Sequence, residues 1–116
     1  MSYIVVGEDD EDIQISLRSM LEDEGYQVNT ASNGELALEL LEEGERPCLM
    51  LVDLFMPVMD GVELIHRLRN DPRYTELPVV VLTASSATGL WPVTPVLKKP
   101  ARHATLMGEV QKHCPC

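Results

Sequence analysis

Blocks of apolar residues recur along the chain, and their spacing predicts strands that alternate with helices. Three runs are almost wholly apolar, as expected of strands buried on both faces: residues 3–7, 48–53 and 78–83. Residues 26–30 alternate between apolar and polar positions, which indicates a more exposed strand. A fifth short strand fits within residues 93–98. Together these runs predict a five-stranded sheet.

Apolar positions at helical spacing lie between the strands and predict helices over residues 12–24, 33–43, 62–69 and 102–112. Asp12 and Asn33 are expected to cap the first two helices, and Gly25 to end the first. The side chains expected to face the core are Ile13, Leu17, Met20, Leu21, Leu36, Ala37, Leu40, Leu41, Val62, Ile65, Leu68, Leu106 and Val110.

This alternation predicts a doubly wound α/β fold, in which helices cover both faces of a parallel sheet. The connections are expected to be right-handed. Ligands of such folds bind at the carboxyl ends of the strands, where the strand order reverses. Residues 1–116 are expected to form one domain, because the length is ordinary for a domain and no linker interrupts the pattern.

Polar side chains follow the predicted strands at these carboxyl ends. Glu8 and Asp9 follow the first strand, Asp53 ends the third, and Thr83 ends the fourth. Lys99 precedes the last helix. Each type alone is common on protein surfaces, but their combination on matching elements predicts a site.

Three neighbouring carboxylates repel one another, and a hard divalent cation relieves that repulsion. Mg²⁺ prefers oxygen ligands; Asp9 and Asp53 suit direct ligation, and the longer Glu8 suits a role through water. The cation would let the Asp53 carboxylate approach an anionic phosphoryl donor as a nucleophile. Lys99 and Thr83 would then contact the transferred oxygens.

The overall charge limits the kinds of partner. The formal net charge is −10, from 19 acidic and 9 basic residues, so binding to nucleic acid or to an anionic membrane surface is not expected. No apolar run approaches the ~20 residues that span a bilayer, and no signal peptide opens the chain. We expect a cytoplasmic protein.

Four segments resemble response-regulator receiver domains of the CheY-like superfamily. Residues 5–13 resemble the acidic opening of the family, and residues 53–61 its D-x-x-M-P-x-M-D-G signature. Residues 78–84 resemble its fourth strand, and residues 99–100 its Lys-Pro pair. The resemblance extends over essentially the whole chain.

The resemblance implies a role for each matching position. Asp53 would accept a phosphoryl group from a histidine kinase or a phosphotransfer protein. Asp9 and Asp53 would bind Mg²⁺ together with the backbone carbonyl of Phe55, and Glu8 would complete the acidic pair. Pro100 would follow a cis peptide bond.

The stretch between Thr83 and Lys99 departs from the family pattern. It is short for a loop, a helix and a strand, and residues 85–95 contain one glycine and two prolines. We therefore predict that the fourth helix is absent or reduced to a turn. Val96 holds the usual aromatic switch position, and Trp91 would either cover bare sheet or move with the loop.

Four functions occur on proteins of this architecture or with this kind of acidic site. A single-domain response regulator that signals through protein contact, without turnover of another substrate, agrees best with the sequence. The alternative is a degenerate receiver that docks or dimerises without phosphorylation; sheet left bare near Trp91 would suit a homodimer. Acids after the first strand disfavour an FMN carrier. Phe55 stands where aspartyl-phosphate phosphatases need a second acid.

The three cysteines indicate no metal or redox site. Cys48 lies in an apolar run and is interpreted as a buried thiol. Cys114 and Cys116 are interpreted as free thiols of a frayed tail, because two terminal thiols alone are weak evidence for a metal or redox site.

Overall fold

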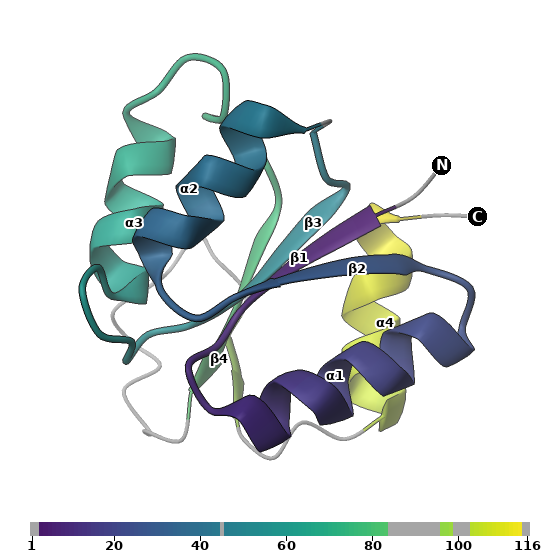
Figure 1. Ribbon diagram of the computed structural model, residues 1–116. Coiled ribbons are helices and arrows are strands. Elements are labelled where there is room, and N and C mark those ends of the chain that lie inside the picture. Colours follow the sequence, from purple (N-terminus) through teal and green to yellow (C-terminus); the bar gives the residue numbers. More distant parts are fainter. Residues whose placement is uncertain (1–2, 45, 84–95, 99–102, 115–116) are drawn as a thin grey trace.

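The computed structural model describes residues 3–44, 46–83, 96–98 and 103–114. The strands are β1 (Tyr3–Gly7), β2 (Gln27–Ala31), β3 (Leu49–Asp53), β4 (Val79–Thr83) and β5 (Val96–Lys98). They form one parallel sheet in the order β2-β1-β3-β4-β5 (Figure 1). The order reverses between β1 and β3, so the carboxyl ends of these two strands flank the crevice where such folds bind ligands.

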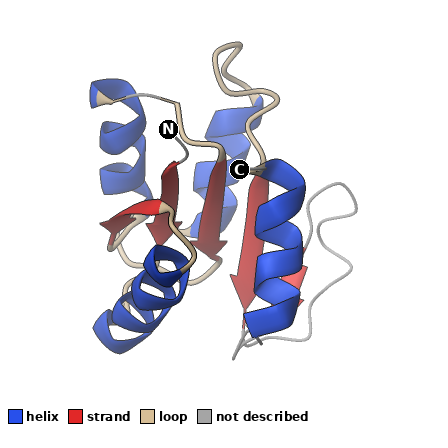
Figure 2. Ribbon diagram, turned by 90° about the vertical axis from the view of Figure 1, so that its right-hand side faces the viewer, coloured by secondary structure: helices blue, strands red, loops and turns tan. Residues whose placement is uncertain are grey.

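Helices cover both faces of the sheet. They are α1 (Glu11–Asp23), α2 (Gly34–Glu43), α3 (Gly61–Arg69) and α4 (His103–His113). Helices α1 and α4 lie on one face, and α2 and α3 lie on the other (Figures 1 and 2). The predicted doubly wound α/β fold is confirmed.

The helix ends follow local hydrogen bonding, with one correction. Helix α1 is capped by Asp10, whose Oδ1 accepts from the backbone N–H groups of Asp12 at 2.9 Å and Ile13 at 3.2 Å. The prediction of Asp12 as the cap was wrong, because Asp10 reaches those N–H groups and Asp12 lies in the first turn. The predicted cap Asn33 accepts from the N–H of Leu36 at 2.9 Å.

Two apolar layers form the core, one on each face of the sheet. Strand residues contribute to the two layers alternately: Val5, Met50 and Val52 to the α2–α3 layer, Ile4, Val6 and Leu51 to the α1–α4 layer. Val62 and Leu36, which were predicted to face the core, are instead 44 % and 41 % exposed. Leu64 and Ile65 fill the core beside Leu68, because their positions on α3 face the sheet.

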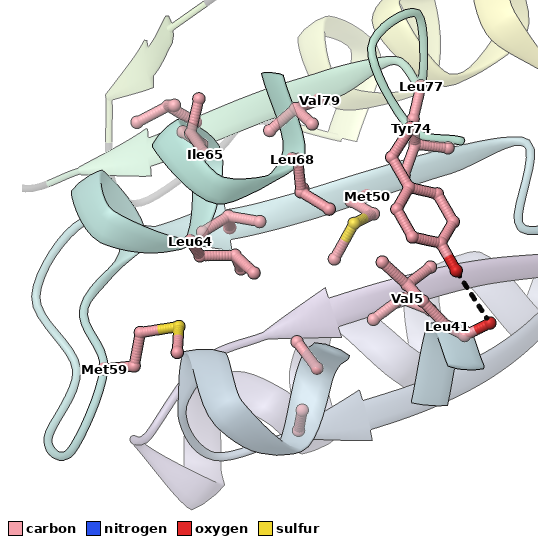
Figure 3. Close-up of a cluster of buried hydrophobic side chains, with 14 of the residues drawn as sticks. Val5, Leu41, Met50, Met59, Leu64, Ile65, Leu68, Tyr74, Leu77 and Val79 are labelled. Carbon is pink, nitrogen blue, oxygen red and sulfur yellow. Dashed lines mark hydrogen bonds between the residues drawn. The ribbon is translucent and has the colours of Figure 1, made fainter. Parts of the chain in front are cut away.

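Figure 3 shows the layer beneath α2 and α3, where Leu64, Leu68 and Met50 interdigitate. Tyr74 closes this layer where the strands begin, and its hydroxyl donates to the backbone carbonyl of Leu41 at 3.3 Å. The bond joins the end of α2 to the loop after α3. The bond thus links the two elements that cover this face of the sheet.

The predictions for Cys48 and Cys114 were wrong. Cys114 is only 1 % exposed and forms a disulfide with Cys48, which lies immediately before β3. The two residues are 66 positions apart in sequence, so no local pattern indicates the pairing. The fold places the end of α4 against the start of β3.

Several predictions fall on residues outside the described ranges. They concern the reduced fourth helix over residues 85–95, Trp91, Lys99, Pro100 and Cys116. The backbone of Val96 belongs to β5, but its side chain is not described. Among the described helices, none is long and apolar enough to span a bilayer.

Candidate functional site

Three acidic side chains meet at the carboxyl edge of the sheet, where the strands end. Carboxylate oxygens of Glu8, Asp9 and Asp53, one from each residue, all lie within 4.8 Å of one another. Glu8 is 1 % exposed and Asp53 is 6 % exposed, whereas Asp9 is open to solvent. The acidic group predicted from the strand ends is therefore assembled in the fold.

Asp53 is positioned by the most central strand of the sheet. It ends β3, whose five residues are all buried, and it pairs in register with Leu82 of β4. The backbone N–H of Phe55 donates to its Oδ1 at 3.2 Å. The buried strand and this hydrogen bond orient the Asp53 carboxylate at the carboxyl edge of the sheet.

Glu8 and Asp9 lie in the turn from β1 to α1. The N–H of Glu8 continues the sheet by donating to the carbonyl of Ala31 at 2.9 Å. Its side chain accepts from the N–H of Asp10 at 3.2 Å, and the Gln14 amide donates to its backbone carbonyl. Acidic side chains here also face the amino end of α1, where the helix dipole favours negative charge.

Thr83 lies on the neighbouring strand. It is fully buried at the end of β4, one position beyond Leu82, the partner of Asp53. Thr83 pairs with Lys98 of β5, so the chain leading to Lys99 also reaches this edge. The side chain of Lys99 lies outside the described residues, and its predicted contact stays a prediction.

The loop after Asp53 contains a tight turn. Val58 has a φ of 66°, which side-chain-bearing residues adopt rarely, and the N–H of Met59 donates to the carbonyl of Pro57 at 2.7 Å. The carbonyl of Met59 accepts in turn from the N–H of Gly34 at 2.8 Å. A Cβ at Gly34 would lie 2.8 Å from Met59, so glycine permits this contact between α2 and the loop.

Gly61 brings the start of α3 against Asp53. A Cβ at this position would lie 2.3 Å from the backbone oxygen of Asp53 and 2.9 Å from the Cα of Leu54. The N–H of Gly61 also donates to the carbonyl of Leu54 at 3.0 Å, which closes the loop. The sequence predicted the start of a helix here but not this contact. The sequence feature that could have indicated the contact is a glycine directly after Asp60, the cap of α3.

The acidic group meets the demands of a divalent cation. Oxygens bound directly to Mg²⁺ at 2.0–2.1 Å lie at most about 4.2 Å apart. A spread of up to 4.8 Å among Glu8, Asp9 and Asp53 suits two direct ligands and one ligand through water. The chain places two of these acids in buried positions, where a counter-charge stabilises them most.

Comparison with protein families gives an independent assignment. Residues 4–91 match the response regulator receiver domain. The matched segment contains Glu8, Asp9, Asp53 and Thr83, and it ends before Lys99.

Two curated relatives differ in how much of their length is matched. A 14.6 kDa protein of Leptolyngbya boryana is 51% identical over 81 residues, which cover 70% of this chain and 61% of that protein. The response regulator receiver protein CpdR of Brucella abortus is 37% identical over 119 residues, covering 97% of this chain and 96% of that protein. In a longer relative the match spans only 35% of the length.

Solved structures agree with this assignment. One is the receiver domain of a sensor histidine kinase from Pseudomonas aeruginosa, with a magnesium ion coordinated in its active site cleft. It has a TM-score of 0.87 at 27% identity, and the match covers 97% of this chain and 96% of that one. The strand order, the acidic group and these matches lead to one conclusion: the chain belongs to the response-regulator receiver domain family of two-component systems.

Proposed function

We propose that this chain accepts a phosphoryl group on Asp53, in a Mg²⁺-dependent reaction with a histidine kinase or a phosphotransfer protein. The observation that carries the proposal is the burial of Asp53 at the end of β3, with carboxylate oxygens of Glu8 and Asp9 within 4.8 Å. Membership of the receiver family and the magnesium-bound neighbour add support.

Each residue of the site has a chemical role in this proposal. Asp9 and Asp53 hold the cation with the backbone carbonyl of Phe55, and Glu8 acts through a bound water. When bound, Mg²⁺ neutralises charge on both reactants. A carboxylate oxygen of Asp53 forms a bond to phosphorus while the bond to the donor breaks, and the donor leaves with the electron pair and takes up a proton. Thr83 donates its hydroxyl hydrogen to a transferred oxygen.

Lys99 would place its ammonium group against the transferred oxygens, and Pro100 would follow it after a cis peptide bond.

The output would be protein contact, since receiver domains are signalling modules and not enzymes acting on a separate substrate. The single-domain organisation over residues 1–116, a reduced fourth helix and a cytoplasmic location belong to the same proposal. The homodimer through the region of Trp91 stays a prediction, as does a switch through Val96.

The test is a set of intact masses after incubation with Mg²⁺ and a small phosphodonor. We expect one phosphoryl adduct on the parent protein and none on Asp53→Asn, or on the parent in excess chelator. Asp12→Asn is the matched control, because it removes an exposed carboxylate of α1 outside the acidic group. It should be phosphorylated like the parent.

The competing function, a docking module that acts without phosphorylation, predicts a different result. In that case no variant would carry an adduct, although each would be folded. An adduct that persists on Asp53→Asn would contradict the assignment of the acceptor.

A further inference from the structure

The Cys48–Cys114 disulfide lies at the amino edge of the sheet, where the strands begin. Cys48 is the residue before β3, and Cys114 is the residue after α4. Their Cα atoms are 5.4 Å apart, within the range that disulfides span without backbone movement. The fold alone therefore brings together two cysteines that are 66 positions apart.

The domain does not need this cross-link to build a core. Disulfides are essential mainly in small domains that bury too little apolar surface. Here two layers of buried side chains enclose the sheet: the α2–α3 layer contains no cysteine, and Cys114 is one of fifteen buried members of the α1–α4 layer. What the disulfide adds is a covalent attachment for one element, the end of α4.

The position accommodates both oxidation states. Cys48 Sγ lies 3.3 Å from the backbone carbonyl oxygen of Tyr3, so a reduced Cys48 thiol finds an acceptor already in place. The hydroxyl of Tyr26 donates to the backbone carbonyl of Cys114 at 2.9 Å, and that bond does not depend on the sulfur. Both hydrogen-bond acceptors are backbone carbonyls, so they are available in either oxidation state.

Access to the two sulfurs differs. Cys114 is 1 % exposed, whereas Cys48 is only partly buried. Thiol–disulfide exchange needs an incoming thiolate to reach a sulfur atom. The reaction is therefore expected to begin at Cys48.

We propose that Cys48 and Cys114 form a reversible redox lock on α4, opened by dithiols and closed by low-molecular-weight disulfides. In opening, a thiolate of the dithiol bonds to Cys48 Sγ, and Cys114 leaves as a thiolate and takes a proton. The second thiol of the dithiol then displaces Cys48, so the reagent is oxidised to its cyclic disulfide. Closing reverses these steps: two protein thiols are oxidised and a small disulfide is reduced to two thiols.

Opening the lock should loosen α4 and leave the rest of the fold in place. Without the cross-link, α4 is held by buried Leu106, Met107 and Val110 and by the bond from Tyr26. Helices at a chain end open locally at a lower free energy than the whole domain. Asp53 lies at the other end of β3, about 16 Å away along the strand, so its chemistry should not sense the lock directly.

The experiment equilibrates the full chain in buffers of reduced and oxidised dithiothreitol, followed by rapid alkylation and mass measurement. Amide hydrogen exchange of residues 103–113 is followed in the same samples. We expect a two-electron transition between one and three alkylated cysteines, with amides of α4 exchanging about tenfold faster or more in the reduced state. Cys48→Ser should exchange like the reduced protein under all conditions.

Cys116→Ser is the matched control, and it should keep both the transition and the difference in exchange. Three outcomes would overturn the proposal: a Cys114–Cys116 disulfide in place of the lock, a cross-link that excess dithiol does not open in the folded protein, or equal exchange of α4 in both states. None of these readouts depends on phosphorylation, so Asp53→Asn should give the parent result whether or not Asp53 is the acceptor.

Discussion

The amino and carboxyl edges of the sheet differ in the charge and the partners of their buried polar side chains. At the amino edge, buried polar groups are paired with main-chain partners: Tyr74 with the carbonyl of Leu41, and Tyr26 with that of Cys114. At the carboxyl edge, three carboxylates gather within 4.8 Å around Asp53. One edge ties helices and loops together through main-chain hydrogen bonds, whereas the other gathers negative charge of the kind that a cation would relieve.

Arg69 is a charged residue at the amino edge that is also bound to main-chain partners. It ends α3 at the amino edge, and its Nη1 donates to the carbonyls of Tyr74, Thr75 and Leu77 at 3.3, 3.2 and 2.9 Å. Burial lowers the pKa of the guanidinium from its ordinary value, but arginine remains charged in proteins. At the amino edge, a positive charge thus binds the carbonyls of the loop after α3. At the carboxyl edge, the described charged groups that gather are carboxylates.

The largest effect on stability should come from crowding the carboxyl edge at Gly61. Gly61→Ala places a Cβ 2.3 Å from the backbone oxygen of Asp53, so α3 or the end of β3 must move. We expect a loss of about 3 kcal/mol in the free energy of unfolding, together with slower phosphorylation. Urea denaturation and intact-mass kinetics would measure both.

Gly108→Ala provides the matched control on α4. No heavy atom lies within 4 Å of the Cβ that this substitution adds, and Gly108 is exposed. Replacing glycine inside a helix by alanine should raise stability by about 0.5–1 kcal/mol. If Gly61→Ala were equally harmless, the close contact at Asp53 would not matter to the fold.

A smaller loss is expected from the amino edge when Arg69 is replaced by methionine. Arg69→Met keeps much of the apolar stem but leaves three carbonyls without their shared donor, which should cost about 2 kcal/mol. Phosphorylation should proceed at close to the parent rate, because the change lies at the opposite edge from Asp53. Denaturation and phosphorylation assays on one preparation separate the two effects.

Arg67→Met on the same helix is the control for that change. Arg67 pairs with Glu63 at 3.5 Å, and both side chains are more than half exposed. Such surface pairs contribute about 0.5 kcal/mol or less. Equal losses in the two variants would show that the carbonyl bonds of Arg69 contribute nothing particular.

The smallest effect on stability should have the opposite sign. Asp9→Asn removes one carboxylate from the acidic group and should raise stability in chelator by about 0.5 kcal/mol, since like-charge repulsion falls. Mg²⁺ at ten times its dissociation constant should stabilise the parent by about 1.4 kcal/mol, and Asp9→Asn should lose most of that gain. Asp12→Asn, which leaves the acidic group intact, should keep it; an equal response of both variants would exclude Asp9 as a ligand.

The sequence predicted the fold where local patterns are strong. Apolar runs such as residues 79–83 lie buried on both faces, which produces a continuous signal. Predictions were wrong where two nearby residues of similar chemistry could occupy the same role. Asp10 rather than Asp12 caps α1, and Leu64 rather than Val62 faces the core. The cap depends on which carboxylate reaches the first N–H groups, and the core position depends on how the helix is rotated against the sheet.

The acidic group was predictable because parallel strands bring their carboxyl ends to one edge. Glu8 and Asp53 needed only the strand boundaries and the fold class to be placed together. The Cys48–Cys114 pair was missed because its partners are 66 positions apart, one before a strand and the other after a helix. The contact between Gly61 and the backbone of Asp53 was missed because it depends on atomic distances that no spacing encodes.

Localising the phosphoryl group tests the central claim most directly. The protein would be phosphorylated with Mg²⁺ and a small phosphodonor and treated with borohydride, which reduces an acyl phosphate to an alcohol. Peptide mass spectrometry would then locate the altered residue. We predict homoserine at position 53 and unaltered Glu8 and Asp9. Reduction at another acidic residue, or phosphorylated protein in which Asp53 stays intact, would contradict the account.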